Sequence, residues 1–251
     1  MLDRFFLRLS YNGQNYHGWQ KQVDVPSVQG QIEDCLQRLF GRSIHCHGCG
    51  RTDKGVHASD FYAHIDLEPK EHLKLKRLDK ILPREIRLKR IYKQDRSQDA
   101  QMHASARTYL YQMHFDKAPF IEETSALYDK TSYDHDKIEK AFLMLREVKD
   151  FKSFCKTPSA YKNTLCNIMD LKISRSTDRI TLQLTANRFL RSMIRYLVAS
   201  ILDVGASRIS LEDWQRILQN ELELPFRKEA YAHGLFLKEV LYPFPLNEWD
   251  S

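Results

Sequence analysis

The segment "GCGRTDKGVHASD" occupies residues 48–60 and decides how the first part of the chain is built. The residues "SIHCHG" (43–48) before it are expected to form a short strand. The residues "DFYAHIDLE" (60–68) after it alternate between apolar and polar side chains, which predicts a second strand. The segment is therefore expected to be a glycine-rich connection held by a strand at each end. At its centre, Asp53 follows Arg51 by two residues, so an acidic and a basic side chain lie close together in the loop.

Two ligand-binding interpretations of this loop fit its residues poorly. A dinucleotide-binding pattern fails because Gly48 and Gly50 are followed by Asp53 where the third glycine should stand, and no Gly-Lys-Ser/Thr triplet is present. An acidic residue would also repel a phosphate. A metal site formed by Asp53, His57 and Asp60 would place a cation among basic neighbours.

Two interpretations of the loop remain open from the residues alone. The first is a structural turn, in which Gly50 and Gly55 adopt unusual dihedral angles and Asp53 caps them. The second is a catalytic carboxylate, which nearby positive charge keeps ionised. Such a group can act as a nucleophile or as a base. Because no second carboxylate is clearly paired with Asp53, a reaction at a sugar carbon of a polynucleotide fits better than glycoside hydrolysis.

The charge of the chain favours a polyanionic partner. The formal net charge is +6 and the pI is about 9.0. The positive excess lies in residues 1–200, whereas acidic side chains outnumber basic ones in residues 201–251. Excess positive charge attracts nucleic acids through counterion release. No apolar run of about 18 residues is present, so no membrane partner is expected. The first residues do not resemble a signal peptide, and we expect a cytoplasmic protein.

The five cysteines predict neither a disulfide framework nor a metal site. Cys46 and Cys49 form one Cys-x-x-Cys pair. A structural zinc site usually needs two such pairs, and Cys155 and Cys166 do not form a second one. We therefore expect reduced, partly buried thiols and no metal, although zinc at Cys46 and Cys49 stays open.

The order of the expected elements predicts an α+β fold. A strand is expected over 4–11, a basic helix over about 72–82 and a long apolar helix over 188–205. Strands and helices alternate without the regular rhythm of a doubly wound sheet, which favours two α+β halves over one undivided α/β domain. The polar stretch near residue 100 sets the expected boundary between an N-terminal domain, 1–103, and a C-terminal domain, 104–251.

Seven segments together resemble the tRNA pseudouridine synthase A family. The loop sequence "GRTDKGVHA" (50–58) resembles the long signature of that family. The other six segments occur in the family's order over nearly the whole chain, and they are "YNGQNYHGWQKQ" (11–22), "SVQGQIEDCL" (27–36), "RTYLYQM" (107–113), "KDFKSF" (149–154), "NRFLRSMIRYLVASILDVG" (187–205) and "GLFL" (234–237).

The resemblance implies an isomerase that converts uridine to pseudouridine at positions 38 to 40 in the anticodon arm of tRNA. It implies a homodimer and neither a cofactor nor a metal. It also implies the pseudouridine synthase fold, in which two related α+β halves share a central mixed or antiparallel sheet and a basic active-site cleft lies between them. Three alternatives stay open: a paralogue that modifies another RNA, a non-catalytic RNA-binding or refolding protein, and an N-glycosidase-like enzyme that releases uracil.

The resemblance also assigns roles to individual residues. Asp53 is expected to attack C1′ of the sugar or to take a proton from C2′. Arg51 is expected to fill the gap left by the flipped base. Tyr109 would stack on the uracil, Arg195 would pair with the aspartate, and Leu235 would line the uracil pocket; core packing is the alternative for Tyr109 and Leu235. Weaker RNA contacts are expected from His17, Trp19, Lys21, Lys54, Lys74, Lys76 and Arg77.

Several positions depart from the family pattern. Asp60 stands where glutamine is common, and Gln101 and Cys166 stand where arginine is frequent. Tyr196 and Ala199 replace an asparagine and a glycine in the helix. The expected chemical set is intact, but two changes remove positive charge where RNA could be held. The sequence therefore supports retained catalysis and leaves the choice of RNA open.

Overall fold

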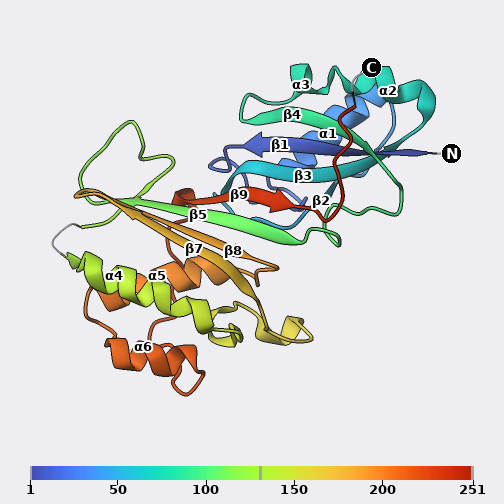
Figure 1. The fold of residues 1–251 in the computed structure, drawn as a ribbon. Coiled ribbons are helices and arrows are strands. Elements are labelled where there is room, and N and C mark those ends of the chain that lie inside the picture. The colour runs from blue at the N-terminus through green and yellow to red at the C-terminus, as the bar shows by residue number, and fades with distance from the viewer. Residues whose placement is uncertain (1, 130–131, 250–251) are drawn as a thin grey trace. The chain divides into compact units, whose positions relative to one another are not determined.

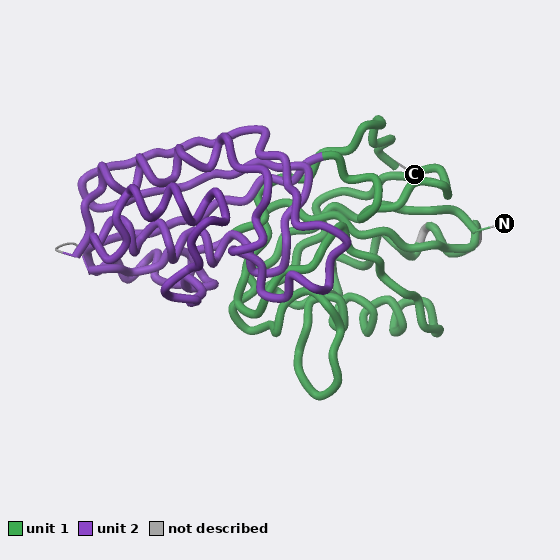
Figure 2. Tube along the Cα trace, turned by 90° about the horizontal axis from the view of Figure 1, so that it is seen from below, with its two compact units in different colours: residues 1–105, 236–251 green, residues 106–235 purple. Residues whose placement is uncertain are grey.

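The computed structural model describes residues 2–129 and 132–249 and mixes helices with strands (Figure 1). It divides into two compact units, of which unit 1 comprises residues 1–105 and 236–251 and unit 2 comprises residues 106–235 (Figure 2). The segment after residue 235 thus belongs to unit 1. The expected domain boundary between residues 103 and 104 stays a prediction.

Unit 1 contains a mixed sheet. Its strands are, in spatial order, β4 (Ile86–Gln94), β1 (Asp3–Tyr11), β3 (His57–Leu67) and β9 (Leu235–Leu241), with β2 (His47–Gly48) paired to β3. Strand β1 is antiparallel to both β3 and β4. Strand β9 is parallel to β3, and this pairing joins His57 to Phe236 and Ala58 to Leu237. The end of the chain therefore pairs with the beginning of β3.

The first helix of unit 1 is α1 (Val28–Phe40). Ser27 caps its N-terminus by accepting a hydrogen bond of 3.2 Å from the backbone N–H of Gly30. Gly41 ends it in the left-handed conformation that glycine adopts most easily. A serine before and a glycine after an apolar-periodic stretch are the end signals that residues 27–41 of the sequence contain.

The expected basic helix over 72–82 is not continuous. The structure has two four-residue helices, α2 (His72–Leu75) and α3 (Leu78–Ile81), both of which contact α1. Helix α3 ends because Leu82 precedes a proline and adopts an extended ψ of 147°.

Unit 2 has its own antiparallel strands. Their order is β5 (Ala106–His114), β8 (Arg179–Ala186) and β7 (Ile168–Arg175), and the short β6 (Ala126–Leu127) pairs in parallel with β5. Along β5, Tyr111 and Met113 are buried and Tyr109 is half-buried on the same face. Since side chains two residues apart on a strand point to the same side, these three share one face of the sheet.

The described part of unit 2 also contains the helices α4 (His135–Leu143), α5 (Met193–Gly205) and α6 (Leu211–Leu218) (Figure 1). Helix α5 starts five residues later than expected, because Ser192 has a φ of 58°, which a right-handed helix cannot contain. The described 3₁₀ helices are Pro69–Glu71, Met144–Glu147, Lys152–Phe154, Pro158–Ala160 and Ala232–Gly234. Within the described ranges, no helix has the length and apolar character that crossing a membrane requires.

Candidate active site

The loop of residues 49–56 runs from β2 into β3, and we call it the catalytic loop for the role that the sequence predicts for Asp53. Asp53 is half-buried at its centre, whereas Arg51 is exposed. The backbone N–H of Val56 donates a hydrogen bond of 3.1 Å to the carbonyl of Asp53, which closes a turn around the aspartate. Gly55, with a φ of 78°, provides the left-handed position of that turn.

A second segment, residues 11–19, supports the catalytic loop, and we call it the supporting segment. The backbone N–H of Trp19 donates to the carbonyl of Thr52 (3.2 Å), and the N–H of Gly55 donates to the carbonyl of Tyr16 (3.2 Å). The hydroxyl groups of Tyr11 and Thr52 are hydrogen-bonded at 2.9 Å and buried. The loop that bears Asp53 is thus fixed by backbone and side-chain bonds on both sides of the aspartate.

Two glycines of the supporting segment permit this close approach. A Cβ atom on Gly13 would lie 1.9 Å from the carbonyl oxygen of Val56, and one on Gly18 would lie 2.2 Å from that of Thr52. Gly18 also has a φ of +88°, which other residues rarely adopt. Sequence reasoning treated this segment only as a turn-rich loop with candidate RNA contacts and missed its supporting role. The glycines at 13 and 18 are the signal that could have revealed it.

His57 anchors the end of the catalytic loop through its side chain. Its side chain is fully buried, its Nδ1 accepts a hydrogen bond of 3.1 Å from the N–H of Gly13, and its ring stacks on Phe236 with centroids 4.7 Å apart. His57 therefore connects the loop to both the supporting segment and β9. This arrangement agrees with a structural role and not with the metal-ligand role considered for it.

The seven residues with weaker predicted RNA contacts all lie in unit 1. Trp19 is only 2% exposed, and its ring stacks on Phe61 with centroids 4.1 Å apart. His17 is half-buried, and the exposed ammonium of Lys21 lies 3.3 Å from a carboxylate oxygen of Glu33. The exposed members of the set are Lys21, Lys54, Lys74, Lys76 and Arg77. Their contact with RNA stays a prediction.

The other predicted site residues lie in unit 2. Tyr109 projects from β5 and contacts Phe189 edge to face, with ring centroids 5.1 Å apart. Leu235, at the start of β9, is buried. Arg195 lies on α5, and its side chain is 16% exposed. Asp53 and Arg51 share the catalytic loop of unit 1, so their meeting with these three side chains stays a prediction.

The guanidinium of Arg195 has a carboxylate partner that the sequence did not reveal. Its Nε donates a hydrogen bond of 2.8 Å to the carbonyl of Ala230, and its Nη1 forms an ion pair with Glu229. The other oxygen of Glu229 accepts from the ammonium of Lys156 at 2.9 Å. Burial alone would raise the pKa of Glu229, but Lys156 and Arg195 outweigh it and lower the pKa below the ordinary value of 4.5.

Two of the departures from the family pattern have structural explanations. Asp60 is buried and forms a two-point ion pair with Arg8, with N–O distances of 2.5 and 3.1 Å. Its carboxylate therefore neutralises a neighbouring cation of the sheet. Cys166 is buried, and burial raises the pKa of its thiol to about 11, so it packs as a neutral side chain.

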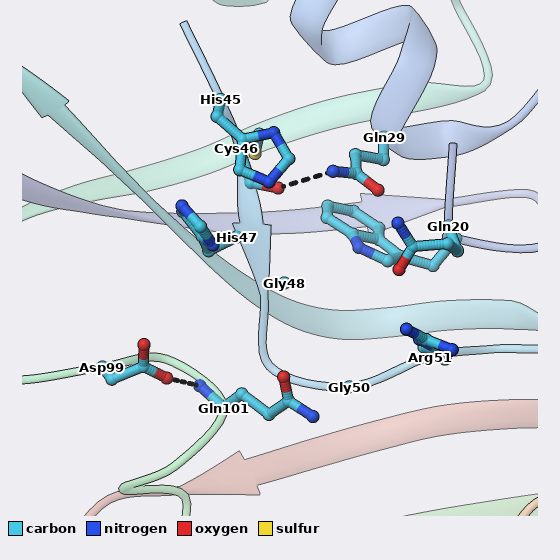
Figure 3. Close-up of a pocket in the computed structure, with 11 residues that line it drawn as sticks. Gln20, Gln29, His45, Cys46, His47, Gly48, Gly50, Arg51, Asp99 and Gln101 are labelled. Carbon is cyan, nitrogen blue, oxygen red and sulfur yellow. Dashed lines mark hydrogen bonds between the residues drawn. The ribbon is translucent and has the colours of Figure 1, made fainter. Parts of the chain in front are cut away.

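The third departure, Gln101, lies at a polar pocket of about 110 Å³ beside the catalytic loop. Figure 3 shows Asp99 and Gln101 on one segment, opposite the stretch from His45 to Arg51 that leads into the loop. Figure 3 also labels Gln20, the residue that follows the supporting segment, at this pocket.

The described residues include no group of three or more His, Cys, Asp or Glu side chains that could hold a metal ion. Cys46 and Cys49 are buried, and burial raises the pKa of the Cys46 thiol. A metal ligand must be a thiolate, so this environment opposes zinc binding at the Cys-x-x-Cys pair.

Comparisons with known proteins agree with the family resemblance of the sequence. A family described as tRNA pseudouridine synthase matches residues 148–243. The tRNA pseudouridine synthase A of Porphyromonas gingivalis is 36% identical, with 98% of this chain and 99% of that protein covered. The protein of the same name from Azobacteroides pseudotrichonymphae is 34% identical, with 96% and 98% covered. The chain belongs to the tRNA pseudouridine synthase A family, and it is a pseudouridine synthase, which is an isomerase.

Solved structures add little to this assignment. The archaeal box H/ACA sRNP Nop10–Cbf5 complex matches with 10% identity and a TM-score of 0.36, covering 79% of this chain and 43% of that one. A likeness at this level carries no argument.

Proposed function

We propose that this protein isomerises uridine to pseudouridine in the anticodon stem-loop of tRNA, at positions 38 to 40, with Asp53 as its single catalytic carboxylate. The observation that carries the proposal is the construction of the catalytic loop. A half-buried aspartate is held by hydrogen bonds on both sides within a motif of the family. A reacting group must be positioned within fractions of an ångström, and such a loop provides that rigidity.

The reaction exchanges one bond for another at C1′ of the ribose. The bond from N1 of the uracil to C1′ breaks, the detached base rotates, and C5 bonds to C1′; the C5 hydrogen leaves as a proton and N1 takes up a proton, so the product is an isomer. Asp53 would begin this sequence either by attacking C1′ or by removing a proton from C2′. Arg51, exposed two residues before it, would take the place of the extruded base.

The residues of unit 2 would complete the site around the uracil. Tyr109 would stack on the base, Leu235 would line its pocket, and Arg195 would pair with Asp53. The contacts of Arg195 to Glu229 and Ala230 hold its guanidinium in place on a mostly apolar helix, as such a positioned cation requires. We also propose that the protein works as a homodimer without metal or cofactor.

Release of tritium tests the reaction, because isomerisation replaces the hydrogen at C5. The substrate is unmodified tRNA that carries tritium at C5 of its uridines, and wild type is compared with Asp53→Asn. We expect wild type to release label into water and the variant to release it about 10⁴-fold more slowly. Mapping of pseudouridine in the product then tests the positions, and release unaffected by a chelator tests the absence of a metal.

Other outcomes of the same assay distinguish the alternatives. Free uracil in the reaction would indicate a glycosidase. Binding of tRNA without release of label by either protein would indicate a non-catalytic RNA-binding protein. Release confined to another RNA would indicate a different substrate, and light scattering that gives the mass of one chain would contradict the homodimer.

A further inference from the structure

Apart from Arg51, the side chains of the polar pocket beside the catalytic loop have no role in the proposed reaction. Its volume is about 110 Å³, and the side chains of Gln20, His47, Asp99 and Gln101 surround it together with Arg51 (Figure 3). Because Gly50 and Arg51 belong to both the pocket and the catalytic loop, an RNA that reaches Asp53 passes next to this pocket. The chemistry of its walls therefore determines which group of that RNA the pocket could bind.

The wall that contains Asp99 is pre-formed. One oxygen of Asp99, Oδ1, accepts hydrogen bonds from the backbone N–H groups of Gln101 (2.7 Å) and Met102 (2.8 Å). The N–H of Ala100 donates to Nδ1 of His64, a side chain that is only 2% exposed. Since this turn is fixed before any ligand arrives, a ligand would lose little free energy in ordering it.

The opposite wall is held by stacking. The ring of His47 lies on that of His64 with centroids 4.8 Å apart and an interplanar angle of 11°. Burial, and then the neighbouring His45, lower the pKa of His47, so this ring is neutral at physiological pH. His47 therefore provides hydrogen-bonding nitrogen atoms without a positive charge.

Asp99 decides which ligand is suitable. Burial alone would raise its pKa, but the hydrogen bonds from Met102 and Gln101 outweigh burial and lower it, so the carboxylate is ionised. Its second oxygen, Oδ2, lies 3.8 Å from Nε2 of His64, too far for a hydrogen bond. An ionised carboxylate repels a phosphate group and accepts hydrogen bonds from N–H donors.

The other walls supply both donors and acceptors. The amide groups of Gln20 and Gln101 can donate and accept, and the guanidinium of Arg51 can only donate. Such a mixture matches the edge of a nucleobase, on which amino and carbonyl groups alternate. Sequence-specific RNA recognition usually reads unstacked bases at such edges.

We propose that this pocket binds the edge of an unpaired RNA base with an exocyclic amino group, which donates a hydrogen bond to Asp99. The inference rests on the proposed function, because the base belongs to the RNA that presents its uridine to Asp53. It adds a base-reading subsite to the catalytic loop, next to the uridine that is isomerised.

The substitution Asp99→Asn distinguishes a base contact from general electrostatics, because the two predict opposite changes in the affinity for RNA. Asparagine can still accept the two backbone hydrogen bonds that cap the turn, but it no longer offers a charged acceptor. Loss of a negative charge strengthens the binding of RNA if only general electrostatics act. If Asp99 holds an amino group, we expect the affinity for unmodified tRNA to fall about tenfold, the scale of one good base contact.

The matched control is Asp95→Asn. Asp95 is exposed, caps a similar turn through a hydrogen bond of 2.8 Å from the N–H of Ser97, and does not line the pocket. We expect this variant to bind tRNA as tightly as wild type or more tightly. Equal thermal stability of both variants and wild type would show that the turn is intact. The variant Gln101→Ala tests another wall of the pocket while it keeps Asp99.

Two further measurements identify the bound group. Loss of a base contact leaves the slope of log affinity against log salt unchanged, whereas loss of a phosphate contact reduces it by about one. Oligocytidylate, which has amino groups, should lose affinity for Asp99→Asn, whereas oligouridylate should not. If Asp99→Asn binds tRNA as tightly as wild type or more tightly, as we expect of Asp95→Asn, the proposal is overturned. These binding results do not depend on isomerisation, so they are distinguishable from a failure of the tritium assay.

Discussion

Replacement of Glu229 by glutamine is a sensitive test of how Arg195 is held. Glutamine has nearly the same shape and can still accept a hydrogen bond, so the change removes mainly the negative charge. The side chains of Arg195 and Glu229 are 16% and 18% exposed, and therefore their ion pair is only weakly screened by water. Lys156, the other partner, is 49% exposed and contributes less.

The expected cost follows from these exposures. A hydrogen bond to a charged group contributes about 1.5–3 kcal/mol, and an exposed ion pair contributes at most about 1 kcal/mol. Since glutamine keeps part of the first contribution, we expect Glu229→Gln to lower the free energy of unfolding by about 2 kcal/mol. For a chain of this length, the melting temperature should fall by roughly 4–8 °C. The exposed Glu223, replaced by glutamine, is the matched control and should change neither quantity.

The pH dependence of this difference has a defined sign. The pKa of Glu229 in the folded protein is below its ordinary value of 4.5. Its charge therefore stabilises the fold fully above pH 4.5, and this contribution is lost as the pH falls through the lowered pKa. Denaturant unfolding of wild type and Glu229→Gln should differ at about pH 7 and converge below pH 4.5. Equal stability at neutral pH, or a difference that does not change with pH, would refute the reasoning.

Three further predictions concern unit 1. Asp53→Asn should reduce tritium release about 10⁴-fold while tRNA binding is kept, because the amide can neither attack nor accept the proton; a variant with normal release would exclude Asp53 as the catalytic group. Gly18→Ala should lower the melting temperature and the activity more than Gly41→Ala, since both have positive φ but only Gly18 faces a clash; equal effects would contradict the supporting role. Asp60→Ala should cost about 2 kcal/mol in denaturant unfolding, because Arg8 loses its partner while remaining one-third exposed, and an Arg8→Ala, Asp60→Ala double variant less destabilised than the single one would show the coupling.

The alternation and the caps in the sequence predict much of the fold correctly. The strand expected over 4–11 is β1, and the helix capped by Ser27 is α1. These signals are local, because they depend on which side chains face a core and on which groups satisfy the ends of a helix. The start of α5 could not be predicted, because the left-handed conformation of Ser192 is not encoded in the residue type.

Less of the candidate site can be predicted from the sequence. The motif identifies Asp53 and Arg51, but the contact of Gly18 with the carbonyl of Thr52 joins segments that are more than thirty residues apart. An arginine on an apolar helix indicates that some carboxylate must lie nearby, and sequence reasoning assigned that role to Asp53. The structure adds Glu229 as a partner of Arg195. The sequence could not reveal this pair, because the number of residues between an arginine and an acidic residue does not indicate whether they meet in the fold.

The parallel pairing of β9 with β3 has a consequence for the synthesis of the protein. Phe236 and Leu237 pair with His57 and Ala58, the residues that directly follow the catalytic loop, and Phe236 also stacks on His57. A growing chain that ends before residue 236 therefore lacks a neighbour of its own catalytic loop, although every residue of that loop was translated long before. The surroundings of this loop are thus completed only when translation is almost finished, and we expect chains that end before residue 236 to be inactive.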